Sequence, residues 1–391
     1  MTISAITGAP ATFASTRRRT AREMLNGRVL TVINCEAALD LASFLEDDVD
    51  GLVLTGEARN ATMRRLRSIY PDMVVMVESS SHHDHFATAA EPFHLPGDEH
   101  SLFGVPTLEE AVHDQRSAKA AIVVLPAGYI RAGDARALRA VVAGANGVDG
   151  DDILVPLYLD KAWLADRYIS QLMAAVDESR HPLAFAFGAS KNPLDSKAKL
   201  ELHARLLAHG AGSVSWRTDY AGLAAFAHGA LGAAIGAIPS QRRVTAPDDK
   251  GQAHRPDDPT PYAIIPGLMH HMKTGAMKYE RYVSSDAPDC LCLECDGRRI
   301  SRFTASQADA RACERHNLEM YRADVRDLLA ATRGARPGVW KQKAQDALLA
   351  HEATAAATGM PFSAGVQVEA WAAGLQVVDV LADRASEPLA H

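Results

Sequence analysis

The sequence predicts an α/β fold: a (β/α)8 TIM barrel followed by a C-terminal zinc-binding subdomain and helices. The first observation is a series of eight short apolar runs, separated by amphipathic helical segments such as residues 134–142 and 196–208. Eight such units over roughly 215 residues suit a closed barrel in number and in length. The second observation is a compact group of cysteines after the last run, at Cys290, Cys292 and Cys295.

The apolar runs are continuous rather than alternating in polarity, as expected for parallel strands that helices cover on both faces. An open, doubly wound sheet is the alternative fold. No Gly-x-Gly-x-x-Gly motif follows the first run, which disfavours the dinucleotide-binding version of that sheet. The predicted strands span residues 28–33, 51–54, 73–77, 121–125, 153–158, 183–187, 213–216 and 233–238.

The cysteine group, together with His316, predicts a structural zinc site. Thiolate sulfur and imidazole nitrogen are ligands that Zn²⁺ prefers, and four of them close a tetrahedron. The chain has 5 cysteines, of which three fall within one short segment, so ordinary buried thiols or disulfide partners are the weaker interpretation. Cys313 lies near His316 and could replace one ligand, whereas Cys35 lies in an apolar stretch and is expected to be buried and inert.

Amino-acid composition along the chain predicts three parts. Residues 1–26 are rich in Ser, Thr, Ala and Arg and are expected to form a flexible arm, with a transit peptide as the alternative. Residues 27–275 are assigned to the barrel, and residues 276–391 to the zinc-binding subdomain and C-terminal helices. No apolar run reaches the roughly 20 residues of a membrane helix, so a cytoplasmic protein without a membrane partner is expected.

Two helices are predicted after the cysteines. In the first, Leu318, Tyr321, Val325 and Leu328 share one face. The pair His316-Asn317 is expected to open that helix, so that a metal ion would hold its N-terminus. The second is predicted over residues 341–357.

The net charge of −7 requires any nucleic-acid-binding surface to concentrate its basic residues locally, because binding to phosphates depends on positioned Lys and Arg. We expect such a surface in the segment from Arg242 to Arg302, because it combines clustered Arg and Lys with the predicted zinc site. The candidate nucleic-acid-binding residues are Arg242, Arg243, Lys273, Arg298, Arg299 and Arg302.

The order of these features resembles the tRNA-guanine transglycosylase family, which includes queuine and archaeosine tRNA-ribosyltransferases. In that family a barrel is followed by a Cys-x-Cys-x2-Cys run and then a His-Asn pair, as in Cys290, Cys292, Cys295 and His316-Asn317. The resemblance implies exchange of a base in tRNA or DNA for a 7-deazaguanine-type base, a structural zinc ion and a homodimer formed through the zinc region. Such exchange uses one nucleophilic carboxylate and a second acid/base carboxylate.

The chain departs from the family pattern at the carboxylates. Glu78, after the third strand, stands where the family has an Asp followed by two glycines. The expected nucleophile position falls on Ile235 or Gly236, and Pro126-Ala127 occupies the position of the purine-reading Asp. Ordinary guanine exchange is therefore not expected, since none of these replacements near the last strand carries a carboxylate.

Three carboxylates remain as candidate catalytic residues. Glu78 is the candidate base, and Asp160 and Asp219 are candidate replacement nucleophiles, because both follow predicted strands at the end where barrel active sites form. Helix N-capping is the alternative for each Asp. The cluster His82-His83-Asp84-His85 also follows a strand and is interpreted as a polar loop rather than a catalytic metal site, since no matching histidines follow strands five, six or eight.

Three functions fit these observations. The first is a transglycosylase-like enzyme acting on a base in tRNA or DNA. The second is a catalytically silent, nucleic-acid-binding or accessory relative of that family. The third is a barrel enzyme with unrelated small-molecule chemistry, because a fold does not fix a function.

Overall fold

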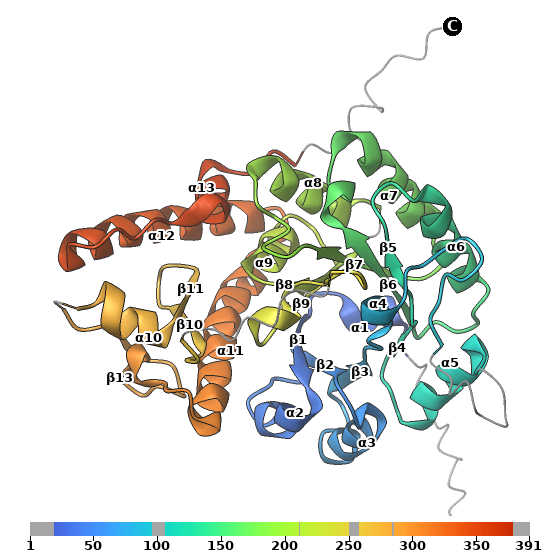
Figure 1. Ribbon diagram of the computed structural model, residues 1–391, viewed down its shortest axis with the longest axis horizontal. Coiled ribbons are helices and arrows are strands. Elements are labelled where there is room, and N and C mark those ends of the chain that lie inside the picture. Colours follow the sequence, from blue (N-terminus) through green and yellow to red (C-terminus); the bar gives the residue numbers. More distant parts are fainter. Residues whose placement is uncertain (1–18, 96–105, 211, 250–257, 284, 378–391) are drawn as a thin grey trace, which may run out of the picture.

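Eight parallel strands form a nearly closed barrel in the computed structural model, which describes residues 19–95, 106–210, 212–249, 258–283 and 285–377 (Figure 1). Adjacent strands follow the order β3-β2-β1-β9-β8-β7-β6-β4. The ends of this order meet where the Ala121 amide donates to the Val75 carbonyl at 2.9 Å. The predicted TIM barrel is confirmed. Its strands are β1 (Val29–Asn34), β2 (Gly51–Thr55), β3 (Val74–Val77), β4 (Val123–Val124), β6 (Ile153–Asp160), β7 (Leu183–Gly188), β8 (Val214–Thr218) and β9 (Gly232–Gly236).

The fourth strand position is split in two. β4 is short, and β5 (Tyr129–Ile130) continues the pairing with β6 further along. Pro126 lies between them and has no N–H to donate to the ladder, which accounts for the break. The apolar run therefore predicted the strand correctly but not its interruption.

Helices cover the outside of the barrel, and the strands are buried along their length, as continuous apolar runs predict. The last of these helices comes from beyond the cysteines. It lies against the edges of β1 and β9, where Val29 and Ile235 line a small cavity together with Tyr321 and Val325. The covering helices are α2 (Cys35–Ala42), α3 (Arg59–Ile69), α5 (Leu108–Ser117), α6 (Ala135–Asn146), α7 (Asp166–Glu178), α8 (Lys197–Ala208), α9 (Tyr220–Ala227) and α11 (Gln307–Ala330).

Part of the predicted flexible arm forms a short helix, α1 (Ala21–Leu25). Thr20 and Glu23 make a reciprocal capping box at its start. Its Ala21 amide donates to the Asp151 carbonyl at 2.6 Å, and Leu25 is buried against the barrel. Residues 1–18 of the predicted arm lie outside the described residues.

The zinc-binding subdomain is inserted between β9 and α11. It begins with the antiparallel hairpin β10 (Tyr262–Ile265) and β11 (His270–Lys273), whose Ala263 and Ile265 pack in one core with Cys290 and Cys295. The hairpin, which lies before the predicted boundary at residue 276, thus shares a core with the cysteines; the boundary itself stays a prediction. The remaining elements are α10 (Thr274–Ala276), η3 (Met277–Arg281), β12 (Asp289–Cys290), β13 (Arg298–Arg299) and η4 (Ile300–Arg302).

α11 begins earlier than predicted. Ser306 caps it by accepting a hydrogen bond from the Asp309 amide, so His316 lies in the middle of the helix rather than at its start. The four apolar residues predicted to share one face, Leu318 to Leu328, are buried as expected.

Two further helices follow, α12 (Arg336–Thr358) and α13 (Gly365–Ala373), and they pack on α9 and α8 respectively. No described helix is both long enough and apolar enough to cross a membrane.

Candidate metal centre and barrel face

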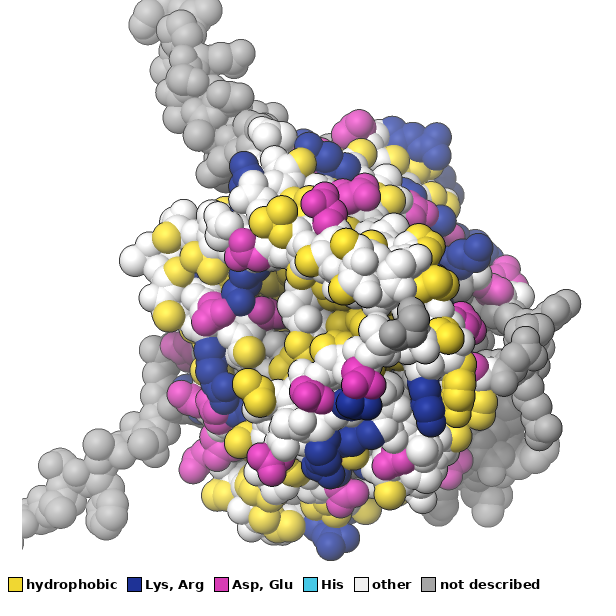
Figure 2. Space-filling view, turned by 90° about the vertical axis from the view of Figure 1, so that its left-hand side faces the viewer, with side chains coloured by type: hydrophobic (Ala, Val, Ile, Leu, Met, Phe, Trp, Pro, Cys, Tyr) yellow, Lys and Arg dark blue, Asp and Glu magenta, His cyan; other side chains and the backbone are white. Residues whose placement is uncertain are grey.

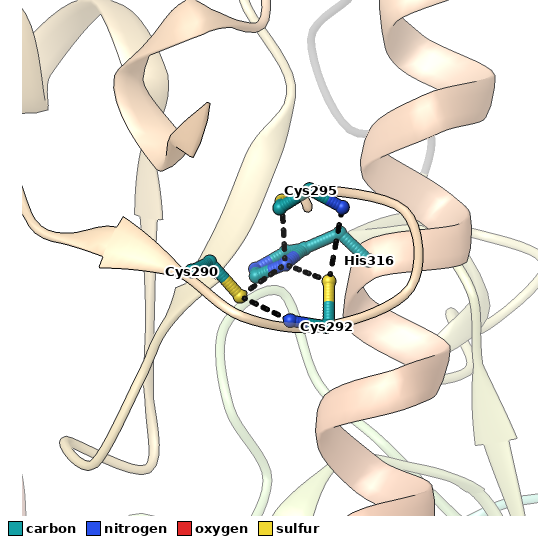
Figure 3. Close-up of side chains that lie close together, drawn as sticks. All are labelled: Cys290, Cys292, Cys295 and His316. Atoms are coloured by element: carbon teal, nitrogen blue, oxygen red, sulfur yellow. Dashed lines mark hydrogen bonds between the residues drawn. The ribbon is translucent and has the colours of Figure 1, made fainter. Parts of the chain in front are cut away.

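The three cysteines and His316 come together as predicted (Figure 3). The cysteines lie on the loop that follows β12, and His316 reaches them from the adjacent face of α11. Their ligand atoms all lie within 4.8 Å of one another, and Cys290, Cys295 and His316 are buried. This is the one group of its kind among the described residues, and it could hold a metal ion.

The spacing of these atoms matches that of ligands around one ion. Each of the three sulfur atoms lies 3.5 Å from His316 Nδ1. An ion bonded to sulfur at about 2.3 Å and to nitrogen at about 2.0 Å in a tetrahedron separates the two ligand atoms by about 3.5 Å. Four protein ligands also leave no open coordination position, which is typical of a structural site.

Neighbouring groups hold the ligands in place. His316 Nε2 donates to the Ile264 carbonyl at 2.8 Å, which leaves Nδ1 free to face the sulfurs. Arg302 lies 3.7 Å from the Cys295 sulfur and stacks over Phe303. Hydrogen bonds from the Cys292 and Cys295 thiols lower the pKa of Cys290 to about 3. Hydrogen bonds with Cys290 and Cys292 raise the pKa of Cys295.

Cys313 is not part of this group. Its sulfur contacts the Tyr262 carbonyl at 3.4 Å, and burial raises the pKa of its thiol to about 12. The structure thus favours His316 over Cys313 as the fourth ligand. Cys35 is half-buried on α2, away from the cluster.

Glu78 is buried at the C-terminal end of β3, with 1% of its surface exposed. Its Oε1 accepts hydrogen bonds from the Tyr158 hydroxyl at 2.8 Å and from Trp216 Nε1 at 2.6 Å. Its Oε2 accepts from Arg217, whose Nε lies at 2.8 Å and whose guanidinium NH2 lies at 2.6 Å. Burial lowers the pKa of Arg217, but the Glu78 carboxylate more than offsets this and holds it above its ordinary value.

A distortion in β8 directs two consecutive side chains towards Glu78. The register with β9 shifts between Ser215 and Thr218, and Arg217 has a left-handed backbone with φ of 50°. In a regular strand consecutive side chains point to opposite faces. The irregularity removes this alternation, so that Trp216 and Arg217 both contact the same carboxylate.

His82, on the short helix α4 (Ser81–Asp84), completes the buried cluster. Its ring stacks on Tyr158 with a centroid distance of 4.0 Å and also contacts His83. Neither ring nitrogen has a hydrogen-bond partner among the described residues, and burial followed by the charge of Arg217 lowers the pKa of His82 well below the ordinary value. The histidine run therefore includes a buried ring rather than a wholly polar loop.

The other two candidate carboxylates both cap helices. Asp160 accepts from the Ala162 amide at 2.8 Å at the start of η1 (Lys161–Trp163). Asp219 accepts from the Ala221 amide at 2.9 Å at the start of α9. Burial raises the pKa of Asp219, which lines a small cavity with Arg217, Thr218 and Arg242. Capping is their observed contact; a catalytic role for either remains a prediction.

The positions that the resemblance assigns to missing carboxylates are closely packed. Ile235 is buried, and a Cβ atom at Gly236 would lie 2.4 Å from the Gln241 carbonyl carbon. Ala127 is fully buried beside β4. A carboxylate at Gly236 would therefore require the backbone after β9 to move.

Most of the candidate nucleic-acid-binding residues contact their own chain. Arg242 donates to the Gly236 and Ala237 carbonyls, and Lys273 donates to the Asp258 carbonyl. Arg298 and Arg302 both donate to the Glu294 carbonyl in the cysteine loop. Of the six, Arg298 and Arg299 are exposed, and Arg299 pairs with Asp286 at 2.5 Å; Arg243 is half-buried.

The side of the molecule that carries the zinc-binding subdomain has no field of one charge. Basic and acidic side chains are interspersed there around a hollow with apolar walls (Figure 2). Five large apolar side chains among the described residues of the subdomain are exposed, with Leu291 at 90% and Leu293 at 77%. The other three are Tyr262 on β10 and Tyr279 and Val283, on or near η3.

Sequence reasoning missed Tyr158, Trp216, Arg217 and the buried role of His82. Each of these residues lies in or shortly after a predicted strand, so the sequence could have predicted its place at the end of the barrel. The mutual contacts were not, because Glu78 and Arg217 are 139 residues apart and meet only when the barrel closes.

Comparison with known proteins adds no family. No family model matches the chain, and no curated protein matches its sequence. Among solved structures the chain is similar to dihydrodipicolinate synthase from Aquifex aeolicus, with 12% identity and a TM-score of 0.33 over 54% of this chain and 69% of that one. It is also similar to a 3-hexulose-6-phosphate synthase, with 16% identity and a TM-score of 0.25 over 54% of this chain and 89% of that one.

Proposed function

We propose that this chain is a nucleic-acid-binding protein of the transglycosylase type whose barrel does not carry out base exchange. One observation carries the absence of base exchange: the carboxylate of Glu78 accepts hydrogen bonds from Tyr158, Trp216 and Arg217. A general base must direct a lone pair at the proton it takes, within about 3 Å. The two oxygens of Glu78 already accept hydrogen bonds from four donor atoms of the same chain. No lone pair is left to take a proton from a substrate.

The remaining carboxylates support the same conclusion. Asp160 and Asp219 are used to cap helices, and the nucleophile position at Ile235–Gly236 is closely packed. Removing the nucleophile of an enzyme that works through a covalent intermediate commonly lowers the rate by many orders of magnitude. The barrel then acts as a scaffold for the inserted subdomain.

The zinc-binding subdomain is the proposed contact surface for tRNA or DNA. Lys278, Arg298 and Arg299 are exposed on it, and Arg298 also donates to the Glu294 carbonyl while Arg299 pairs with Asp286. Arg242 and Lys273 are less exposed and donate to carbonyl groups. A zinc ion bound by the three cysteines and His316 would cross-link the loop after β12 to α11. The ion would fix the surface that carries these cations and would leave no coordination position for substrate water.

A homodimer formed through the same subdomain is part of the proposal. Leu291, Leu293, Tyr279 and Val283 are exposed on one subdomain, and large exposed apolar side chains in proximity are typical of protein interfaces. Leu291 and Leu293 flank a proposed metal ligand, so metal binding would fix their direction.

A small-molecule enzyme is the second candidate. The cavity shared by Asp219, Arg217 and Arg242 favours it, because the cavity lies where barrel active sites form. Its volume of about 20 Å³ holds about one water molecule, so a substrate would have to displace surrounding side chains. A chain that binds no nucleic acid even at low salt would favour the small-molecule enzyme.

Binding of tRNA and of duplex DNA to the purified protein tests the proposal. We expect binding that weakens steeply as salt rises, because each phosphate contact releases counterions. Arg298→Glu/Arg299→Glu should weaken binding and lower the salt slope. The matched control is Arg136→Glu/Arg139→Glu, which reverses two exposed charges on α6, outside the zinc-binding subdomain. Equal loss in both variants, or no binding by the wild type, would contradict the proposal.

A further inference from the structure

The metal centre is joined to the barrel face by a continuous set of buried contacts. It begins at α11, where two consecutive residues bind β10. His316 Nε2 donates to the Ile264 carbonyl at 2.8 Å, and Asn317 Oδ1 accepts from the Ile264 amide at 2.7 Å. Asn317 Nδ2 also donates to the Tyr262 carbonyl at 2.7 Å. His316, a proposed metal ligand, therefore also holds β10 against α11.

The next contact runs from the hairpin back to α11. Ile264 pairs with His271 in β11, and His271 Nε2 lies 3.0 Å from the Tyr321 hydroxyl in a hydrogen bond. The Tyr321 ring in turn packs on Tyr220, with a centroid distance of 4.8 Å. Tyr220 is the first residue of α9, directly after the cap Asp219.

Arg242 lies at the point where these elements meet. Its guanidinium donates to the Gly236 and Ala237 carbonyls at the end of β9 and lines the same cavity as Asp219. Burial lowers the pKa of His271, and the charge of Arg242 lowers it further. Burial raises the pKa of Tyr321, and the charge of Arg242 offsets part of this rise. Arg242 thus lines the cavity that also contains the Asp219 carboxylate, and its charge acts on His271 and Tyr321.

We propose that His271 and Tyr321 are positioning residues through which the metal centre sets the geometry of Asp219 and Arg242 at the ends of β8 and β9. The β10–β11 hairpin is short, and among the described residues it is held by α11, by its own core, by His351 of α12, which donates to the Leu268 carbonyl at 3.0 Å, and by Tyr220 of α9, whose ring contacts His271. When the metal ligands separate, the His316–Ile264 bond is released and His271 loses its fixed distance to Tyr321. The barrel face then changes although none of its own residues binds the metal. This inference does not depend on the proposed function.

Hydrogen–deuterium exchange of the full chain tests the inference. The reporter amides are Ala221, whose N–H bonds Asp219, and Ala237, whose N–H bonds the Val32 carbonyl. We expect chelation of the metal with EDTA to speed exchange at both, as well as in residues 262–316, while residues 51–69 on the opposite side of β1 keep their protection. Unchanged exchange at Ala221 and Ala237 after complete metal removal would overturn the inference.

A second arm separates positioning from general unfolding, should chelation unfold the chain. His271→Leu removes the hydrogen bond to Tyr321 but none of the proposed ligands, so metal content should stay at that of the wild type. We expect faster exchange at Ala221 and Ala237 in this metal-loaded variant and recovery in His271→Gln, which restores a polar side chain. If metal-loaded His271→Leu exchanges like the wild type, the proposed route through His271 is wrong.

Discussion

The metal centre and the barrel face are both buried polar clusters, yet they differ in how the chain assembles them. Three of the four proposed metal ligands lie within one loop, and their spacing alone identified them. The barrel-face residues come from β3, β6 and β8, and they meet only because eight strands close a circle. The difference teaches that short-range motifs reveal chemistry directly, whereas a barrel site has to be found in three dimensions.

The two clusters also differ in what they leave available. The sulfurs and Nδ1 of the metal centre face one another at the spacing of ligands around an ion. The oxygens of Glu78, by contrast, are fully used by donors from the same chain. One cluster is arranged to receive a partner, and the other is already complete.

The largest expected effect is at the metal centre. Cys292→Ser should lose the bound zinc and unfold the inserted subdomain, because metal binding contributes about 10 kcal/mol or more at small structural sites. Metal analysis should find one zinc per chain in the wild type and almost none in the variant. Cys313→Ser is the matched control and should leave the metal content unchanged, since its sulfur lies against the Tyr262 carbonyl and Asn317 Nδ2 rather than against the proposed ligands. Retention of both zinc and thermal stability by Cys292→Ser would refute the ligand assignment.

Removing the charge of Glu78 should have the next largest effect. Glu78→Gln leaves the buried cation of Arg217 without its partner, which is expected to cost about 3–5 kcal/mol of unfolding free energy. Urea denaturation measures this loss. The double variant Glu78→Leu/Arg217→Met removes both charges and should recover part of it. A change below about 1 kcal/mol in Glu78→Gln would show that the ion pair is not structural.

Acid should weaken the barrel through buried histidines. Burial lowers the pKa of His203 to about 3, from an ordinary value of 6.5. Its folded-state pKa is below that of the unfolded chain, so the unfolded state binds the proton first as pH falls. Stability is therefore complete above pH 6.5 and decreases by about 1.4 kcal/mol per pH unit below it. His203→Gln should flatten the pH dependence of the unfolding free energy by one proton; an unchanged slope between pH 6.5 and 5 would contradict this.

The smallest effect on stability is expected on the exposed apolar residues. Leu291→Asp and Leu293→Asp should change the unfolding free energy by only about 0.5 kcal/mol, because both side chains are exposed. If the subdomain forms a homodimer, the same variants should convert it to a monomer in light scattering. Leu349→Asp on α12 is the control, since Leu349 is also exposed. A wild type that is already monomeric would remove the dimer from the proposal.

Much of the fold could be read from the sequence, because buried parallel strands leave continuous apolar runs. Each of the eight predicted runs overlaps a barrel strand, and the helix over residues 196–208 begins one residue after its predicted start. The start of α11 was misplaced, since the capping residues Ser306 and Asp309 were overlooked in favour of the His316-Asn317 pair. The hairpin of β10 and β11 was not predicted.

The candidate sites divide in the same way. Ligand identity at the metal centre followed from residue type and spacing, whereas Cys313 could be set aside only from its contact with Tyr262. At the barrel face the sequence placed Glu78 at a strand end but gave no sign of Arg217, whose direction depends on an irregularity in β8. The arginines near the cysteines looked like a binding surface, yet Arg298 and Arg302 hold the loop itself.

Guanine incorporation into tRNA tests the central claim most directly, because it asks whether the completed barrel face still performs base exchange. Wild-type protein with full zinc content is incubated with bulk tRNA and radiolabelled guanine, beside Glu78→Gln, Asp160→Asn and Asp219→Asn. The account predicts no incorporation by any of the four proteins while the wild type still binds tRNA. Robust incorporation by the wild type that one of these substitutions abolishes would contradict it and would identify the carboxylate that carries the reaction.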